Sequence, residues 1–317
     1  MTKRLDRNWK KIWHDSCISL SNKIFNIFNL LEEKTMKTYL LKLQSLGIAA
    51  GLTLGAVMVL SMFAWTTASA DVANTKHNLG STGPGPNNFS GTTEVCVFCH
   101  TPHGADTSAE VPLWNKALAA PGTYTTYDTL GTSSLDGATA PVGSVSIACL
   151  SCHDGVQAMD AVLNAPGSGA GGDAVWAAGV WTGANQTLGV LTSFANLGQD
   201  LTDDHPIGIQ YGGGGIKTST PTAPTRDDDF VQTGQGLENA QVNGQTIWWV
   251  DTEAVPNGTR EKTDMQLYTR SVAAIDSGEL QPFVECASCH DPHSEAPLLF
   301  LRVSNDGSEV CLACHVK

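Results

Sequence analysis

The chain has 317 residues, 9 cysteines, 9 histidines and a formal net charge of -13. Residues 71–317 contain 9 Lys and Arg against 27 Asp and Glu, together with 29 of the 32 Gly and all 14 Pro. So acidic a segment repels phosphate backbones, which excludes a nucleic-acid partner. Its composition, with few apolar runs of helical period, also argues against a large conventional hydrophobic core.

The N-terminal segment has the pattern of an export signal. An uncharged stretch over residues 46–65 follows two lysines and ends shortly before Ala-Ser-Ala, the kind of small-residue sequence that signal peptidases cleave. We therefore predict a signal peptide at residues 36–70, cleavage before Asp71, and no stable membrane anchor in the mature domain, residues 71–317. The alternative is an uncleaved anchor, because about 20 apolar residues can span a bilayer.

A further 35 residues precede Met36, whereas a signal peptide normally begins with only a short basic segment. The codons for the Glu-Glu-Lys sequence just before Met36 are purine-rich, as a ribosome-binding site is. We therefore predict that residues 1–35 are an untranslated or mis-annotated extension.

The eight cysteines after residue 70 fall into four copies of the pattern C-x-x-C-H. Two thiols three positions apart can form thioether bonds with the two vinyl groups of one heme, and the next histidine binds the iron from the same side. The pattern predicts four heme c groups, called hemes 1 to 4 in chain order. The thioether cysteines are Cys96 and Cys99, Cys149 and Cys152, Cys286 and Cys289, and Cys311 and Cys314. The proximal iron ligands are His100, His153, His290 and His315.

Two other uses of paired cysteines compete with this prediction. Disulfides form readily in exported proteins, but four C-x-x-C bridges would close only very small loops and would leave the four histidines unexplained. Paired C-x-x-C units also bind zinc tetrahedrally, but zinc does not require a histidine at the next position of every copy. Heme attachment therefore explains the pattern best.

Four histidines remain for the second axial position of the four irons. They are His77, His103, His205 and His293. Methionine is the usual competitor for this position, but only two methionines, Met159 and Met265, follow residue 70. Four bis-histidine hemes would use the histidines completely, although any one of them could instead be an ordinary surface or core residue.

The spacing of these histidines suggests which heme each one binds. His103 and His293 each lie three residues past a proximal histidine, on the same side of the porphyrin, so each should bind a different heme. The simplest assignment sends His103 to heme 2 and His293 to heme 4. His205 would then serve heme 1 or heme 3. We expect His77, near the mature N-terminus, to bind a heme of a neighbouring subunit, with heme 1 of its own chain as the alternative.

A long insert separates the second attachment motif from the third, whose first cysteines are 137 residues apart. This Gly-rich insert covers about residues 156–280. Within it, residues 164–189 and 211–229 show no sustained helical period and are predicted to be surface loops.

Residues 237–253 read as two short strands around Asn243-Gly244, a dipeptide that favours a two-residue hairpin turn. Trp248 and Trp249 would face opposite sides of this hairpin. One could cover a heme edge and the other a neighbouring subunit, with ordinary packing as the alternative. The expected fold class is mostly irregular coil with short helices at the heme-attachment motifs and a small β-hairpin, a multiheme cytochrome c built around a stacked heme chain.

Five stretches of the mature segment, outside the insert, carry a resemblance to a known family: residues 74–79, 95–104, 112–115, 286–293 and 311–315. Through them the chain resembles the multiheme outer-surface c-type cytochromes of metal-respiring bacteria, most closely their tetraheme filament-forming OmcE type. The resemblance implies bis-histidine hemes in a continuous stacked chain, identical subunits polymerised head to tail, and long-range electron transport to extracellular acceptors.

We therefore expect extracellular electron transfer through four covalently bound bis-histidine c-type hemes, in the subunit of a polymeric conductive filament, or nanowire, and no enzymatic activity. The expected partners are neighbouring identical subunits, redox partner cytochromes and extracellular metal acceptors. The expected location is extracellular or at the cell surface, alternatively periplasmic. A monomeric periplasmic tetraheme carrier is the alternative function. A multiheme reductase would need a heme with an open position for substrate, against which the complete histidine count argues.

Overall fold

The computed structural model of the chain describes residues 72–166, 176–183, 186–187, 190–191 and 194–316. The predicted signal peptide and the extension before it lie outside the described residues, as does part of the predicted loop 164–189. Within the part of the chain that the structure describes, no helix has the length and apolar character needed to cross a membrane.

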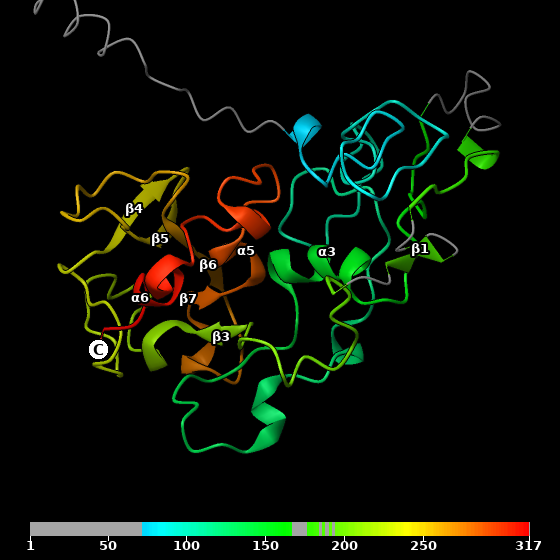
Figure 1. The fold of residues 1–317 in the computed structure, drawn as a ribbon. Coiled ribbons are helices and arrows are strands. Elements are labelled where there is room, and N and C mark those ends of the chain that lie inside the picture. Colours follow the sequence, from blue (N-terminus) through cyan, green and yellow to red (C-terminus); the bar gives the residue numbers. More distant parts are fainter. Residues whose placement is uncertain (1–71, 167–175, 184–185, 188–189, 192–193, 317) are drawn as a thin grey trace, which may run out of the picture. The chain divides into compact units, whose positions relative to one another are not determined.

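Most of the described chain is irregular coil, and its three short α-helices each carry cysteines of an attachment motif (Figure 1). These helices are α3 (Ser144–His153), α5 (Cys286–Cys289) and α6 (Glu309–Leu312). The expected coil is therefore confirmed, and the expected short helices are present at the second, third and fourth motifs, while the first motif forms a turn. Single turns of 3-10 helix occur at Val72–Asn74, Pro121–Thr123, Tyr127–Leu130, Tyr211–Gly213, Asp276–Gly278, Leu298–Phe300 and Asp306–Ser308.

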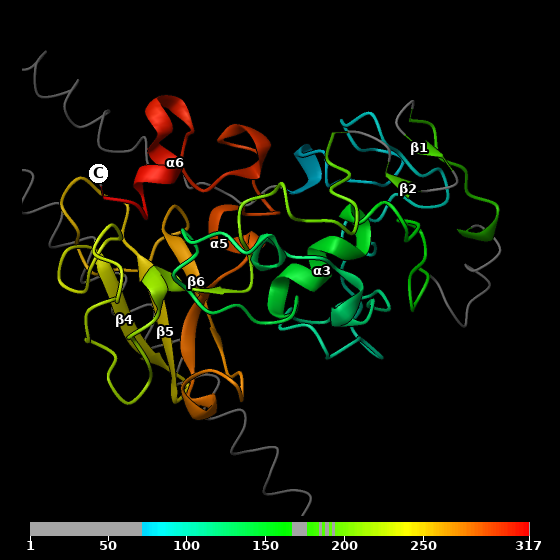
Figure 2. The ribbon, with the colours of Figure 1, turned by 90° about the horizontal axis from the view of Figure 1, so that it is seen from below.

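The sheet is larger than the expected hairpin. It has five antiparallel strands in the order β3-β7-β6-β5-β4, and Figure 2 shows β4, β5 and β6 side by side. The strands are β3 (Ile209–Gln210), β4 (Leu237–Val242), β5 (Gln245–Val250), β6 (Met265–Arg270) and β7 (Gln281–Val284). A separate two-stranded sheet consists of β1 (Gln186–Thr187) and β2 (Val190–Leu191). The insert thus supplies most of the strands, and β7 leads directly into α5.

The predicted hairpin is confirmed as the pair β4–β5. Leu237 pairs with Val250 and Val242 pairs with Gln245, which leaves Asn243 and Gly244 as the two turn residues. Their φ angles of 52° and 79° are the two left-handed conformations that a type I′ turn requires.

The prediction of a surface loop over residues 211–229 is wrong for its first half. Tyr211 and Ile216 are fully buried and belong to the same apolar cluster as Trp248. Between them, Gly212 to Gly215 all have positive φ, a backbone conformation that residues with a Cβ rarely adopt. The glycines therefore let the chain fold back on itself, so that the flanking apolar side chains pack against the sheet.

Both tryptophans of β5 are buried, at 1% exposure for Trp248 and 2% for Trp249. Neither forms an exposed surface for a neighbouring subunit, so ordinary packing describes them best. The Trp248 cluster also contacts Cys289 and Cys314, which links the sheet to the last two attachment motifs. The described core consists of four such clusters instead of one large core.

Truncation of Trp248 should strongly destabilise the protein. Because the side chain is almost fully buried in the sheet cluster, Trp248→Ala is expected to lower the free energy of unfolding by about 3–5 kcal/mol. The measurement is chemical unfolding of the heme-loaded protein followed by far-ultraviolet circular dichroism. Phe194 is 86% exposed, and Phe194→Ala should change the free energy by no more than about 0.5 kcal/mol. Equal unfolding midpoints for the two variants would contradict the packing of Trp248.

Candidate heme-binding sites

Each C-x-x-C-H motif forms one helical turn closed by its own backbone. The carbonyl of Cys96 accepts hydrogen bonds from the N–H groups of Cys99 at 3.1 Å and His100 at 2.8 Å. The corresponding bonds join His290 to Cys286 at 3.2 Å and His315 to Cys311 at 2.9 Å, and the second motif lies in α3. Since residues three apart lie on the same face of a helical turn, this turn places both thiols where one heme can reach them.

The geometry disfavours the two competing uses of the cysteines. All eight are free thiols in the structure. Among the described residues, only one group of three or more His, Cys, Asp or Glu side chains lies close enough together to hold a metal ion, and it consists of the carboxylates of Asp251, Glu253 and Asp264. The cysteine pairs therefore do not gather into a tetrahedral zinc site.

Each proximal histidine lies beside an extended segment from elsewhere in the chain. The backbone of His100 is bridged to Trp114, that of His290 to Leu301, and that of His315 to Phe230. For His153 the corresponding contact is with Leu197, whose N–H donates to the His153 carbonyl at 2.8 Å. These paired segments fix the position of each motif.

Hydrogen bonds to backbone carbonyls orient five imidazole rings. Each Nδ1 donates to a carbonyl oxygen, which leaves Nε2 as the nitrogen available to a metal. Burial lowers the pKa of His77 to about 4 and also lowers that of His290, so both rings are neutral at pH 7, the form that binds metals. The bonds are His77 to Pro292 at 2.8 Å, His100 to Pro112 at 2.8 Å, His153 to Ala195 at 2.7 Å, His205 to Pro206 at 3.0 Å and His290 to Leu299 at 2.9 Å.

Two of the remaining histidines face proximal histidines at the distance expected across an iron atom. The ring centroids of His77 and His153 are 6.2 Å apart, and those of His100 and His293 are 6.3 Å apart. Two imidazoles that bind one metal from opposite sides, with metal–nitrogen bonds of about 2 Å, have centroids about 6 Å apart. The residues therefore fit hemes 1 and 2 with histidine on both sides.

This arrangement differs from two of the expected assignments. His293 lies opposite His100 of heme 1 and not opposite His315 of heme 4. The place opposite His153 of heme 2, expected for His103, is taken by His77. The loop after the third motif contacts His77 and His100. Tertiary contacts, and not the order of the histidines in the sequence, therefore determine which histidines face each other.

In the structure the N-terminal segment contacts its own chain, whereas we expected His77 to bind a heme of a neighbouring subunit. The His77 ring stacks on Phe300 with centroids 4.0 Å apart, and its Nδ1 binds the carbonyl of Pro292. The neighbouring Lys76 forms an ion pair with Glu295. Three contacts with residues 292–300 thus hold His77 beside His153.

The other two candidate ligands, His103 and His205, lie at the protein surface. Both His103 and His205 are exposed. His205 lies three residues before Gly208, whose N–H donates at 2.8 Å to the carbonyl of Val284, at the entrance to α5 and the third motif. Of the two hemes considered for His205, this position favours heme 3. The carbonyl of His103 accepts hydrogen bonds from Thr101 and Asn164, which fix the backbone and leave the side chain in solvent.

The four motifs lie next to one another in chain order. Cys99 and Cys152 pack against one apolar cluster, which contains Phe98 and Met159. The N–H of Cys286 donates to the hydroxyl of Ser146, in the helix of the second motif, at 2.9 Å, and Cys289 and Cys314 pack against the sheet cluster. The first motif is therefore adjacent to the second, the second to the third, and the third to the fourth.

Residues 281–317 match the family described as the doubled CXXCH motif. The matched segment begins with β7 and contains the third and fourth attachment motifs. The match supports a protein that carries covalently bound heme c and transfers electrons. A comparison with curated proteins finds no match for the chain.

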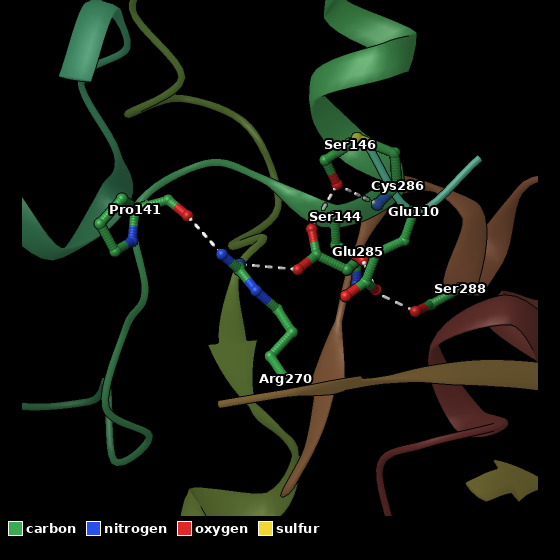
Figure 3. Close-up of polar contacts among 8 residues, drawn as sticks. All are labelled: Glu110, Pro141, Ser144, Ser146, Arg270, Glu285, Cys286 and Ser288. Atoms are coloured by element: carbon green, nitrogen blue, oxygen red, sulfur yellow. Dashed lines mark hydrogen bonds and ion pairs between the residues drawn. The ribbon is translucent and has the colours of Figure 1, made fainter. Parts of the chain in front are cut away.

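A buried polar network positions the third motif against the second (Figure 3). Ser146 of α3 donates to the Glu285 carboxylate at 2.5 Å and accepts a hydrogen bond from the Cys286 N–H at 2.9 Å. Arg270 of β6 donates to the same carboxylate at 2.9 Å and to the carbonyl of Pro141 at 2.8 Å. Glu285 also caps α5 through a reciprocal exchange with Ser288. The sequence carries only a weak signal for this network, an acidic residue just before the motif.

The stability of the network should depend on pH. Burial raises the pKa of Glu285 to about 7, against the opposing effect of Arg270. A carboxyl group whose pKa is higher in the folded state stabilises the protein at low pH, and this contribution disappears as the pH rises toward 7. Between pH 4.5 and 7 the contribution should fall by about 3 kcal/mol, and Glu285→Gln should abolish this fall.

The measurement is the denaturant midpoint of the heme-loaded protein at several pH values. Glu279 forms an exposed ion pair with Lys217, so Glu279→Gln serves as the matched control and should retain the fall. A pH dependence that is the same in Glu285→Gln and in the unmodified protein would show that Glu285 is ionised in the folded state throughout this range.

Proposed function

We propose that the protein is a tetraheme c-type cytochrome that transfers electrons along hemes 1 to 4, each with two histidine ligands. The observation that carries the proposal is the spatial order of the motifs, in which consecutive motifs share an apolar cluster or are joined by a hydrogen bond between their helices. When bound, the hemes supply the one-electron carriers. The chain orients the imidazoles through backbone carbonyls and packs apolar side chains against the second cysteine of each motif.

The histidine positions favour one set of distal ligands. His293 serves heme 1 and His77 serves heme 2, on the basis of the ring separations. His205 serves heme 3, because the strand that follows it pairs with β7 next to the third motif. His103 is then left without an iron in its own chain, while heme 4 still needs a ligand.

We propose that His103 binds heme 4 of a neighbouring identical subunit. His103 is exposed and lies three residues after His100, at the heme 1 end of the series. The other end carries exposed Cys311, Leu312 and Val316 around the fourth motif. A contact between one end and the other is heterologous and need not close, so it can propagate into a filament.

In this proposal the filament is extracellular or at the cell surface, and its ends exchange electrons with redox partner cytochromes or extracellular metal acceptors. The second candidate is a monomeric periplasmic tetraheme carrier, which the match to the doubled CXXCH motif supports equally well. The filament requires His103 to bind heme 4 of the next subunit, whereas the monomeric carrier does not.

The test combines intact mass, electron microscopy and spin state. The mature protein is expected to begin at Asp71, to carry four covalent hemes and to form filaments in negative stain. His103→Ala should give monomers in which one heme of four is high spin. His205→Ala is the matched control, with one high-spin heme and normal filaments.

Each outcome distinguishes the candidates. Filaments of His103→Ala would refute the junction, and monomers of the unmodified protein with four low-spin hemes would favour the periplasmic carrier. A mass that fits fewer than four hemes would contradict the electron-transfer proposal itself.

A further inference from the structure

Lys116 is a fully buried lysine, with 0% of its surface exposed. Lysine is almost never fully buried unless its charge is satisfied, because removal of an ammonium group from water is strongly unfavourable. Its Nζ donates hydrogen bonds to the carbonyls of Ala158 at 2.9 Å, Met159 at 3.2 Å and Ala161 at 3.2 Å. An ammonium group has three N–H donors, so the three carbonyls satisfy the charged form completely.

This buried cation lies beside the first two attachment motifs. The N–H of the preceding residue, Asn115, donates to the carbonyl of Cys99 at 2.9 Å. On the other side, Met159 belongs to the apolar cluster against which Cys99 and Cys152 both pack. The positive charge of Lys116 therefore lies beside the segments that carry the first two motifs.

A buried carboxylate distinguishes the second motif from the first. Asp154 directly follows His153, is 4% exposed, and accepts hydrogen bonds from Tyr124 at 3.2 Å and from the Val156 N–H at 2.9 Å. Its negative charge therefore lies directly beside the proximal histidine of the second motif, whereas the charged side chain beside the first motif is Lys116. Heme 2 is thus exposed to two opposite charges and heme 1 mainly to the cation.

We propose that Lys116 is an electrostatic positioning residue that raises the reduction potential of heme 1 above that of heme 2. The inference rests on the proposed function, since it requires hemes at both motifs. Each heme gains one electron on reduction and loses one unit of positive charge, so a fixed cation nearby favours the reduced form. A buried charge has a larger effect than a surface charge because water and salt screen it less.

The test is a redox titration in which each heme is followed separately by its NMR signals. In Lys116→Gln, the ratio of reduced to oxidised heme 1 at a fixed potential should fall about tenfold, which corresponds to a midpoint lower by about 59 mV for one electron. Heme 2 should shift less, and hemes 3 and 4 should not shift. Lys116→Arg keeps the charge and should restore the midpoint. Lys217→Gln removes an equal charge from an exposed ion pair and should leave heme 1 unchanged.

A second variant covers the case in which Lys116→Gln does not fold. Ala161 is exposed, and its carbonyl binds the ammonium group of Lys116, so Ala161→Asp adds a carboxylate nearby without emptying the buried site. It should lower the midpoint of heme 1 in the same direction. An unchanged heme 1 midpoint in either folded variant, with four hemes by mass, would overturn the inference alone. Fewer than four hemes in the unmodified protein would instead overturn the proposed function.

Discussion

Replacement of His293 by alanine is expected to convert heme 1 to the high-spin state and to leave the other three hemes low spin. The ring of His293 faces His100 at 6.3 Å, and its loss removes one of two strong-field nitrogen ligands from that iron. About one quarter of the total heme should therefore become high spin, as measured by magnetic circular dichroism. His293→Met supplies another common axial ligand and should keep the heme largely low spin.

A variant that lacks heme 4 tests whether His293 binds heme 1 or heme 4. The spacing of the histidines in the sequence suggested heme 4. Cys311→Ala with Cys314→Ala removes heme 4 and leaves three hemes. If His293 serves heme 1, its replacement in this background should still produce one high-spin heme. A spectrum in which the three remaining hemes stay low spin would assign His293 to heme 4 and reject the ring geometry.

Removal of heme 3 should interrupt electron exchange along the protein. Cys286 is hydrogen-bonded to Ser146 in the helix of the second motif, and Cys289 and Cys314 pack against one cluster, so the third motif connects the second to the fourth. Cys286→Ala with Cys289→Ala should yield three hemes by intact mass. Exchange between heme 4 and the first two hemes should slow by orders of magnitude, as measured by NMR of partly reduced monomers.

The matched control for this prediction removes a terminal heme. Cys311→Ala with Cys314→Ala also leaves three hemes, but they are consecutive and should keep rapid exchange. Rapid exchange of heme 4 in the variant without heme 3 would contradict the linear order of the motifs.

Several features could be predicted from short stretches of sequence because their causes are local. A C-x-x-C-H motif closes its own turn, as the 2.8 Å bond from His100 to Cys96 shows. Asn243 and Gly244 adopt the left-handed conformations of a hairpin turn with little help from the rest of the chain.

Other features could not be predicted because they depend on contacts between distant residues. The lack of a helical period suggested a surface loop over residues 211–229, but glycines with positive φ turn the first part of this segment back into the sheet cluster. Lys116 and Glu285 carry no sequence signal for burial, since polar residues are usually exposed. Their burial becomes possible only where three carbonyls, or Ser146 and Arg270, satisfy them.

The sequence by itself determined the hairpin turn and predicted the attachment chemistry and the proximal histidines, because each depends on residues within a few positions of one another. The tertiary structure decided which distal histidine faces which proximal one. His77 reaches His153 because Pro292, Glu295 and Phe300, more than 200 residues further along the chain, hold it there. Two histidines that face each other come from distant parts of the chain, and no periodicity or spacing in the sequence indicates that they lie close together in the fold.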